Sequence, residues 1–132
     1  MSEFKILIEI ELNEKPSVVY EAWLDSDGHE QFTGAPANFT KLVGADFTAW
    51  DGYIFGEIIA LVPNKRILQS WRTLEFDENT PDSMLDVTFT ATDNGTLFTL
   101  SHTQLDSETA VAKYAAGWDE FYVQPMTEFY ND

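Results

Sequence analysis

The chain has 132 residues, which is the size of one domain, because domains average roughly 100–200 residues. Its 7 basic and 23 acidic residues give a formal net charge of −16. A surface of that sign repels phosphate backbones and anionic membranes, which argues against nucleic acid or an anionic lipid surface as a partner. The same charge disfavours a strongly anionic small ligand.

The chain contains no cysteine, which rules out disulfides, thiolate catalysis and cysteine-ligated metals. The N-terminal sequence MSEFKILIEIEL has acidic residues where a signal peptide would be apolar. The longest apolar run, Ile58 to Val62, is far shorter than the ~20 residues that a membrane-spanning helix needs. We therefore expect one cytoplasmic domain over residues 1–132, without membrane insertion.

The first predicted element is a half-buried strand. Apolar residues alternate with charged ones from Phe4 to Leu12, with Leu7 as the exception, and alternation with a period of two is typical of a strand with one buried face. The opposite, charged face comprises Glu3, Lys5, Glu9 and Glu11.

Two short helices are predicted after this strand. Pro16 suits a first helical position because its ring presets φ, and apolar residues follow at helical spacing up to Trp23. A second short helix is expected to reach Phe32. Between them, the sequence DSDG at 25–28 resembles part of a calcium-binding loop. Its glycine comes too early and the closing glutamate is missing, which favours a plain turn.

The middle of the chain predicts an antiparallel meander. Asp51-Gly52 and Asn94-Gly95 are hairpin signals, because these residue pairs tolerate a positive φ. Turn signals recur about every ten residues, which suits consecutive antiparallel strands. The expected strands lie near 46–50, 53–62, 66–75, 83–92 and 96–104.

The last predicted element is a long helix. Asp106 or Ser107 can cap its start, and Pro125 removes one backbone hydrogen bond inside it, so we expect a kink there. An apolar stripe follows three- and four-residue steps, and it comprises Val111, Tyr114, Ala115, Trp118, Tyr122, Pro125, Met126 and Phe129. No other element is large enough to cover the apolar face of the sheet. We therefore predict an α+β fold, with a curved antiparallel sheet of six to seven strands around a long C-terminal helix.

Strand parity predicts which side chains face that helix. The inward set combines aromatic rings and branched aliphatic side chains with few polar groups, among them Gln69, Thr96 and His102. Ordinary core packing is the alternative for most of this set, and His102 is then a buried imidazole with its hydrogen bonds satisfied. The candidate cavity residues are Phe47, Ile54, Ile58, Gln69, Trp71, Val87, Phe89, Phe98, Leu100, His102, Trp118 and Tyr122.

Short motifs along nearly the whole chain occur in an order typical of one family. They are PSVVYEAW at 16–23, FTG at 32–34 with PA at 36–37, GADF at 44–47, GYIFG at 52–56, LVP at 61–63, KRI at 65–67 with WR at 71–72, GT at 95–96 with Leu100 and His102, and GW at 117–118 followed by Tyr122, Pro125 and Met126. This set resembles the activator of heat-shock protein 90 ATPase homologue 1-like family, part of the START-like (SRPBCC, Bet v-like) helix-grip superfamily.

The resemblance implies a helix-grip domain with an elongated cavity between sheet and long helix. Relatives of this kind bind lipids, sterols or hormones, and some are aromatase/cyclase enzymes. The eukaryotic namesake stimulates a chaperone ATPase and carries a further N-terminal domain. Because this chain starts directly at the START-like strand, we expect that it does not accelerate that ATPase by itself.

Three functions follow, in this order. The first is non-enzymatic binding of a small hydrophobic or amphipathic ligand between sheet and helix. The second is an interaction module that regulates the heat-shock protein 90 ATPase or acts in a stress response. The third is a cyclase- or hydrolase-like enzyme in the same cavity, which would need an inward acid or base.

The sequence offers little catalytic machinery for the third function. It has two histidines, His29 and His102, without metal-ligand spacing, and it lacks the glycine pattern of a phosphate loop and the G-x-S-x-G motif of a hydrolase. We predict no catalytic residues, no metal and no cofactor, and a monomer or weak homodimer.

Overall fold

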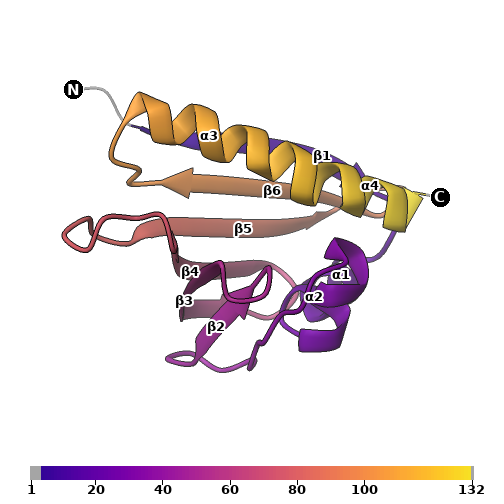
Figure 1. Ribbon diagram of the computed structural model, residues 1–132. Coiled ribbons are helices and arrows are strands. Elements are labelled where there is room, and N and C mark those ends of the chain that lie inside the picture. Colours follow the sequence, from indigo (N-terminus) through magenta and orange to yellow (C-terminus); the bar gives the residue numbers. More distant parts are fainter. Residues whose placement is uncertain (1–3, 132) are drawn as a thin grey trace.

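A computed structural model describes residues 4–131, and Figure 1 shows its architecture. The chain order begins with a strand and two short helices, continues with five strands and ends in a long helical segment. The elements are β1 (Ile6–Leu12), α1 (Pro16–Trp23), α2 (Ser26–Thr33), β2 (Asp46–Ala49), β3 (Ile54–Val62), β4 (Arg66–Thr73), β5 (Ser83–Ala91), β6 (Thr96–Thr103), α3 (Glu108–Trp118), a π-helical turn (Asp119–Val123) and α4 (Gln124–Asn131).

The strands form one antiparallel sheet in the order β1-β6-β5-β4-β3-β2. From β2 to β6 each strand pairs with the next in sequence, as the turn spacing predicts, and β1 returns to pair with β6. In Figure 1 the C-terminal helical segment runs along one face of the sheet, with α1 and α2 near one of its ends. The predicted α+β helix-grip fold, with six strands, is confirmed.

The inward face of the sheet is the one that strand parity predicts. The register places Val87 opposite Leu100 and Phe89 opposite Phe98, and all four side chains are buried. Along β1, Ile6 and Leu12 are buried while the alternate residues are exposed. Glu3, predicted for the outer face, lies outside the described residues.

Local signals set the ends of the first two helices. Pro16 is the first residue of α1. The Asp25 carboxylate accepts a hydrogen bond of 2.8 Å from the Gly28 amide and caps α2, and Gly34 ends that helix with φ of 84°. The DSDG sequence is therefore a helix cap. Residues 4–131 contain no cluster of three histidine, aspartate or glutamate residues that could hold a metal ion.

The C-terminal helix changes its winding before Pro125. Ser107 caps it by accepting a hydrogen bond from the Ala110 amide. Residues Asp119–Val123 form a π-helical turn, in which the Gln124 amide donates to the Asp119 carbonyl. The disruption expected at Pro125 thus takes the form of a wider turn directly before a residue that has no N–H to donate.

The π-helical turn also explains the helix's buried stripe. Tyr114, Trp118, Tyr122 and Met126 are all buried and follow one another in steps of four. At 3.6 residues per turn such steps drift by about 40° each. The wider turn reverses part of that drift and keeps all four side chains facing the sheet. Within the described part of the chain, no helix is long and apolar enough to cross a membrane.

Candidate functional site: an aromatic cavity

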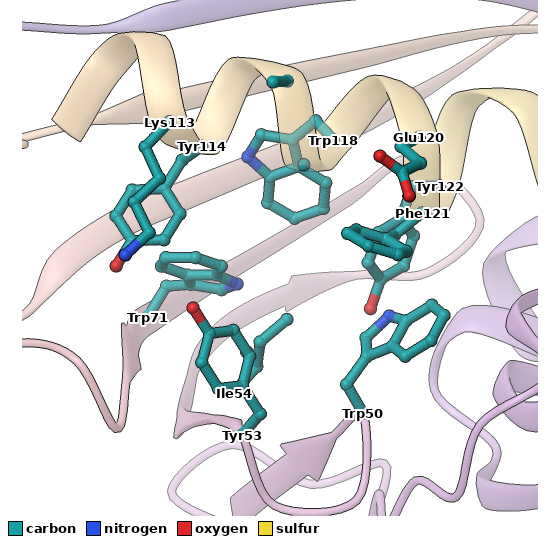
Figure 2. Close-up of a pocket in the computed structure, with 12 residues that line it drawn as sticks. Trp50, Tyr53, Ile54, Trp71, Lys113, Tyr114, Trp118, Glu120, Phe121 and Tyr122 are labelled. Carbon is teal, nitrogen blue, oxygen red and sulfur yellow. The ribbon is translucent and has the colours of Figure 1, made fainter. Parts of the chain in front are cut away.

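A cavity of about 510 Å³ lies between the β2–β3 hairpin and the C-terminal helix. Figure 2 shows side chains from the hairpin and β4 facing side chains from the helix across this space. The volume falls in the range of about 300–1,000 Å³ typical of small-molecule sites. Its lining is mostly aromatic and consists of Trp50, Tyr53, Ile54, Trp71, Lys113, Tyr114, Ala116, Gly117, Trp118, Glu120, Phe121 and Tyr122.

The hairpin turn places Trp50 on the wall at a cost in backbone strain. Trp50 and Asp51 have φ of 52° and 57°, in the left-handed region that bulky residues rarely adopt. The turn is held by a hydrogen bond of 2.9 Å from the Asp51 amide to the Pro36 carbonyl. A residue held in this conformation destabilises the fold by about 1–3 kcal/mol, and such residues cluster at functional sites. Trp50 is therefore a candidate binding residue.

The inner wall is a continuous set of ring contacts. The Trp71 ring lies 4.4 Å from the His102 ring, 5.1 Å from Tyr114 and 5.7 Å from Trp118, measured between centroids. Trp118 in turn lies 4.8 Å from Tyr122. Because each ring is held by others, this wall is preformed.

One end of the cavity carries a polar cluster that ties the helix to the sheet. Glu75 accepts hydrogen bonds from the Tyr53 hydroxyl and from Lys113 on α3. Thr73 and Tyr114 are hydrogen-bonded at 2.9 Å. The pKa of Glu75 is lowered, first by Lys113 and then by Tyr53. Burial, with a contribution from Glu75, raises the pKa of Tyr53 to about 12.

The other end is formed by Trp50, Phe121, Tyr122 and Glu120 (Figure 2). The Trp50 ring meets Phe121 at 5.0 Å and Tyr122 at 6.5 Å, both in T-shaped arrangements. The Trp50 indole nitrogen is buried and has no hydrogen-bond partner. It faces the Tyr122 hydroxyl without reaching hydrogen-bond geometry (Figure 2). The indole nitrogen is therefore directed at the protein's own Tyr122 and is closed off from the cavity.

Behind this wall, Tyr122 is fixed by His29. The Nδ1 of His29 lies 2.9 Å from the Trp23 carbonyl and donates to it. Nε2 must then accept the 2.8 Å hydrogen bond from the Tyr122 hydroxyl. Burial lowers the pKa of His29 to about 4 and raises the pKa of Tyr122, so both groups are neutral at neutral pH.

His102 is held in a second buried network. The Ser83 hydroxyl donates to the Trp71 carbonyl at 2.6 Å, so it accepts the 2.8 Å hydrogen bond from Nε2 of His102. Nδ1 then accepts from the Trp118 indole at 3.0 Å. Burial lowers the pKa of His102 to about 3. Both ring nitrogens have protein partners, and the imidazole is neutral.

The structure divides the twelve predicted cavity residues into two groups. Ile54, Trp71, Trp118 and Tyr122 line the cavity. The remaining eight side chains are buried in the core and do not line it: Phe47, Ile58, Gln69, Val87, Phe89, Phe98, Leu100 and His102. Gln69 accepts a 2.9 Å hydrogen bond from the Trp23 indole, so this polar group, like His102, has a protein partner.

Sequence reasoning missed much of the cavity's outer part. Trp50 and Tyr53 flank the Asp51-Gly52 hairpin signal, and Phe121 lies beside the predicted stripe of the helix. Trp50 could have been suspected, because an aromatic residue next to a tight turn at the sheet's edge can fold over its face. Phe121 could not, since only the π-helical turn brings it and Tyr122 to the same cavity.

Residues 13–130 match the family model of Activator of Hsp90 ATPase homolog 1-like proteins. The chain belongs to this family. The match spans both the hairpin and the helix that form the cavity, so the cavity lies within the family's domain. No curated protein matches the sequence significantly.

Solved structures share the family fold across nearly the whole chain. An HSP90 activator from Plasmodium falciparum has 21% identity and a TM-score of 0.84, covering 95% of this chain and 94% of that one. The Aha1 dimer from Colwellia psychrerythraea has 17% identity and a TM-score of 0.79, covering 93% of each chain. CalU16 from Micromonospora echinospora has 22% identity and a TM-score of 0.79, covering 95% of this chain and 73% of that one. At these identities the likeness shows the fold.

Proposed function

We propose that this protein binds a small, largely apolar ligand in the aromatic cavity. The observation that carries the proposal is a preformed space of about 510 Å³ whose lining includes seven aromatic rings, at Trp50, Tyr53, Trp71, Tyr114, Trp118, Phe121 and Tyr122. Burying apolar ligand surface there yields roughly 25 cal/mol per Å² before the cost of association is subtracted.

The test is binding of hydrophobic probes to the purified protein. Three of the chain's four tryptophans line the cavity, so titration with decanol should change tryptophan emission saturably. Native mass spectrometry of freshly purified protein should also show a co-purified small molecule.

A matched pair of variants locates the binding site. Gly117 faces the cavity, and a Cβ there would meet only Phe121, at 3.9 Å. Gly117→Leu should therefore fill the space and abolish binding. Ala112→Leu, at an exposed position on the same helix outside the cavity lining, should leave binding unchanged. Absence of saturable binding in the wild type, or equal binding by both variants, would contradict the proposal.

We further propose that the cavity binds its ligand without transforming it. Both histidines lie outside the lining with lowered pKa values. The Lys113 amine is paired with Glu75, and the pKa values of Tyr53 and Tyr122 are raised. A general acid or base works best with a pKa near the working pH. A ligand recovered chemically changed after incubation would overturn this.

Regulation of the Hsp90 ATPase is a second candidate function. It is favoured by the family match and by the likeness to the Plasmodium falciparum HSP90 activator. Adding the purified protein to the Hsp90 of its own organism tests it directly. A several-fold increase in ATPase rate would establish this second function, and an unchanged rate would contradict it. Cytoplasmic location stays a prediction.

A further inference from the structure

The two charged side chains on the cavity wall differ in how they are paired. The Lys113 amine forms a salt bridge with Glu75, so its charge is balanced locally. Glu120 lines the opposite end of the space (Figure 2) and forms no ion pair with residues 4–131. The wall therefore has an unbalanced negative charge at the end formed by Glu120.

Aromatic rings surround that same end. Trp50 meets Phe121 at an interplanar angle of 63° and Tyr122 at 69°, so the three rings form a corner rather than a flat stack. We call this the Glu120 corner: Trp50, Glu120, Phe121 and Tyr122. Ring faces attract cations within about 6 Å, tryptophan most strongly. A group placed in this corner contacts several rings and lies beside a carboxylate.

The charge of the whole molecule acts in the same direction. A net charge of −16 raises the local concentration of cations near the surface and lowers that of anions. The Phe121 side chain is 43% exposed, so the corner lies at the cavity's boundary with solvent. A ligand can place a charged group there and keep it partly hydrated, which lowers the cost of burying that charge.

Building on the proposed function, we propose that the ligand is an amphipathic organic cation. Its ammonium group lies in the Glu120 corner, and its apolar body extends along Trp71 and Trp118 toward the other end of the cavity. The unbalanced carboxylate, the ring corner and the net charge each favour a cation over a neutral or anionic ligand with the same body.

The test compares three probes that share a decyl chain: decyltrimethylammonium, decanol and decyl sulfate. Each is titrated below its micelle-forming concentration by isothermal calorimetry. We expect the cation to bind about tenfold more tightly than the alcohol, as stabilisation by ring faces and a carboxylate predicts. The sulfate should bind most weakly.

Two charge-matched variants distinguish the effect of the Glu120 carboxylate on cation affinity from the effect of the protein's net charge. Glu120→Gln and Glu11→Gln each remove one negative charge, but Glu11 lies exposed on the outer face of β1. Glu120→Gln should lower cation affinity several-fold and leave decanol affinity unchanged, while Glu11→Gln should change neither. At about 0.15 M NaCl, where the Debye length is about 8 Å, distant surface charges are screened more than the adjacent Glu120, so the difference between these variants should remain measurable. Trp50→Leu should also reduce the preference for the cation.

The outcomes distinguish this inference from the proposed function. If decanol binds in the cavity but the cation binds no more tightly, or if Glu120→Gln and Glu11→Gln behave alike, the cationic ligand is refuted and the binding function stands. If none of the three probes binds, the proposed function itself fails.

Discussion

Truncating Trp71 to alanine should both destabilise the protein and enlarge its binding site. The Trp71 side chain is only 4% exposed, and its ring contacts those of Phe76, His102, Tyr114 and Trp118. Loss of a buried tryptophan costs about 3–5 kcal/mol. Part of the Trp71 surface already borders the cavity, so fewer packing contacts disappear and water can enter the space. We therefore expect the lower end, about 3 kcal/mol.

Phe98→Ala is the matched control. Phe98 is 2% exposed and is held between Trp23 and Phe89, each at 5.7 Å between ring centroids. It does not line the cavity, so its removal leaves a closed void. The cost should lie at the upper end, about 4–5 kcal/mol. Domains have about 5–15 kcal/mol of stability in total, so Trp71→Ala should still fold and Phe98→Ala should have the lower unfolding free energy of the two variants.

Urea unfolding and alcohol binding together test this pair. Trp71→Ala should shift the preference from decanol toward longer alcohols, whereas Phe98→Ala should lose stability without any such shift. A Trp71→Ala variant that unfolds like the wild type would show that strand parity is wrong by one residue. An equal shift in ligand size for Phe98→Ala would show that the binding space reaches into the core.

Three further predictions follow. Buried His29 and His102 have pKa values lowered to about 4 and about 3, so below about pH 6.5 the unfolded chain binds protons that the folded chain does not. Each histidine should lower the unfolding free energy by about 1.4 kcal/mol per pH unit, down to about pH 4. The difference in urea midpoint between the wild type and the His29→Phe variant should therefore become smaller as the pH falls from about 6.5 to about 4. A difference that does not change with pH would contradict this prediction. Gly117→Ala should raise the unfolding free energy by up to about 1 kcal/mol, because a Cβ there has space. Gly56→Ala should lower the unfolding free energy by about 1–3 kcal/mol, since its Cβ would lie 2.2 Å from the Ser70 carbonyl oxygen. If thermal melts show Gly56→Ala to be more stable than Gly117→Ala, the inferred clash at Gly56 is refuted. Asp25→Ala should cost about 1 kcal/mol through loss of the α2 cap, and added calcium should leave the melting temperature of the wild type unchanged; a calcium-dependent shift would restore the metal-loop interpretation.

Local sequence patterns were sufficient to predict the faces of the strands and the order of the elements. Alternation with a period of two shows which side chains of a strand point inward, and turn residues show where each strand ends. These signals are local, so they placed Val87, Phe98 and Leu100 on the inner face correctly. The first turn of α1 and the Ser107 cap of α3 are likewise fixed by neighbouring residues.

The position of the cavity on the inward face depends on tertiary packing and could not be predicted from local patterns. An inward side chain can meet another side chain or border a cavity, and no local pattern distinguishes the two. Phe98 meets rings from α1 and β5 and fills the core, whereas Trp71 borders the open space beneath the helix. The positive φ of Trp50 and the π-helical turn before Pro125 bring Trp50, Phe121 and Tyr122 to the same corner. That corner depends on how far the helix stands from the hairpin, a distance set by the packing of the whole sheet.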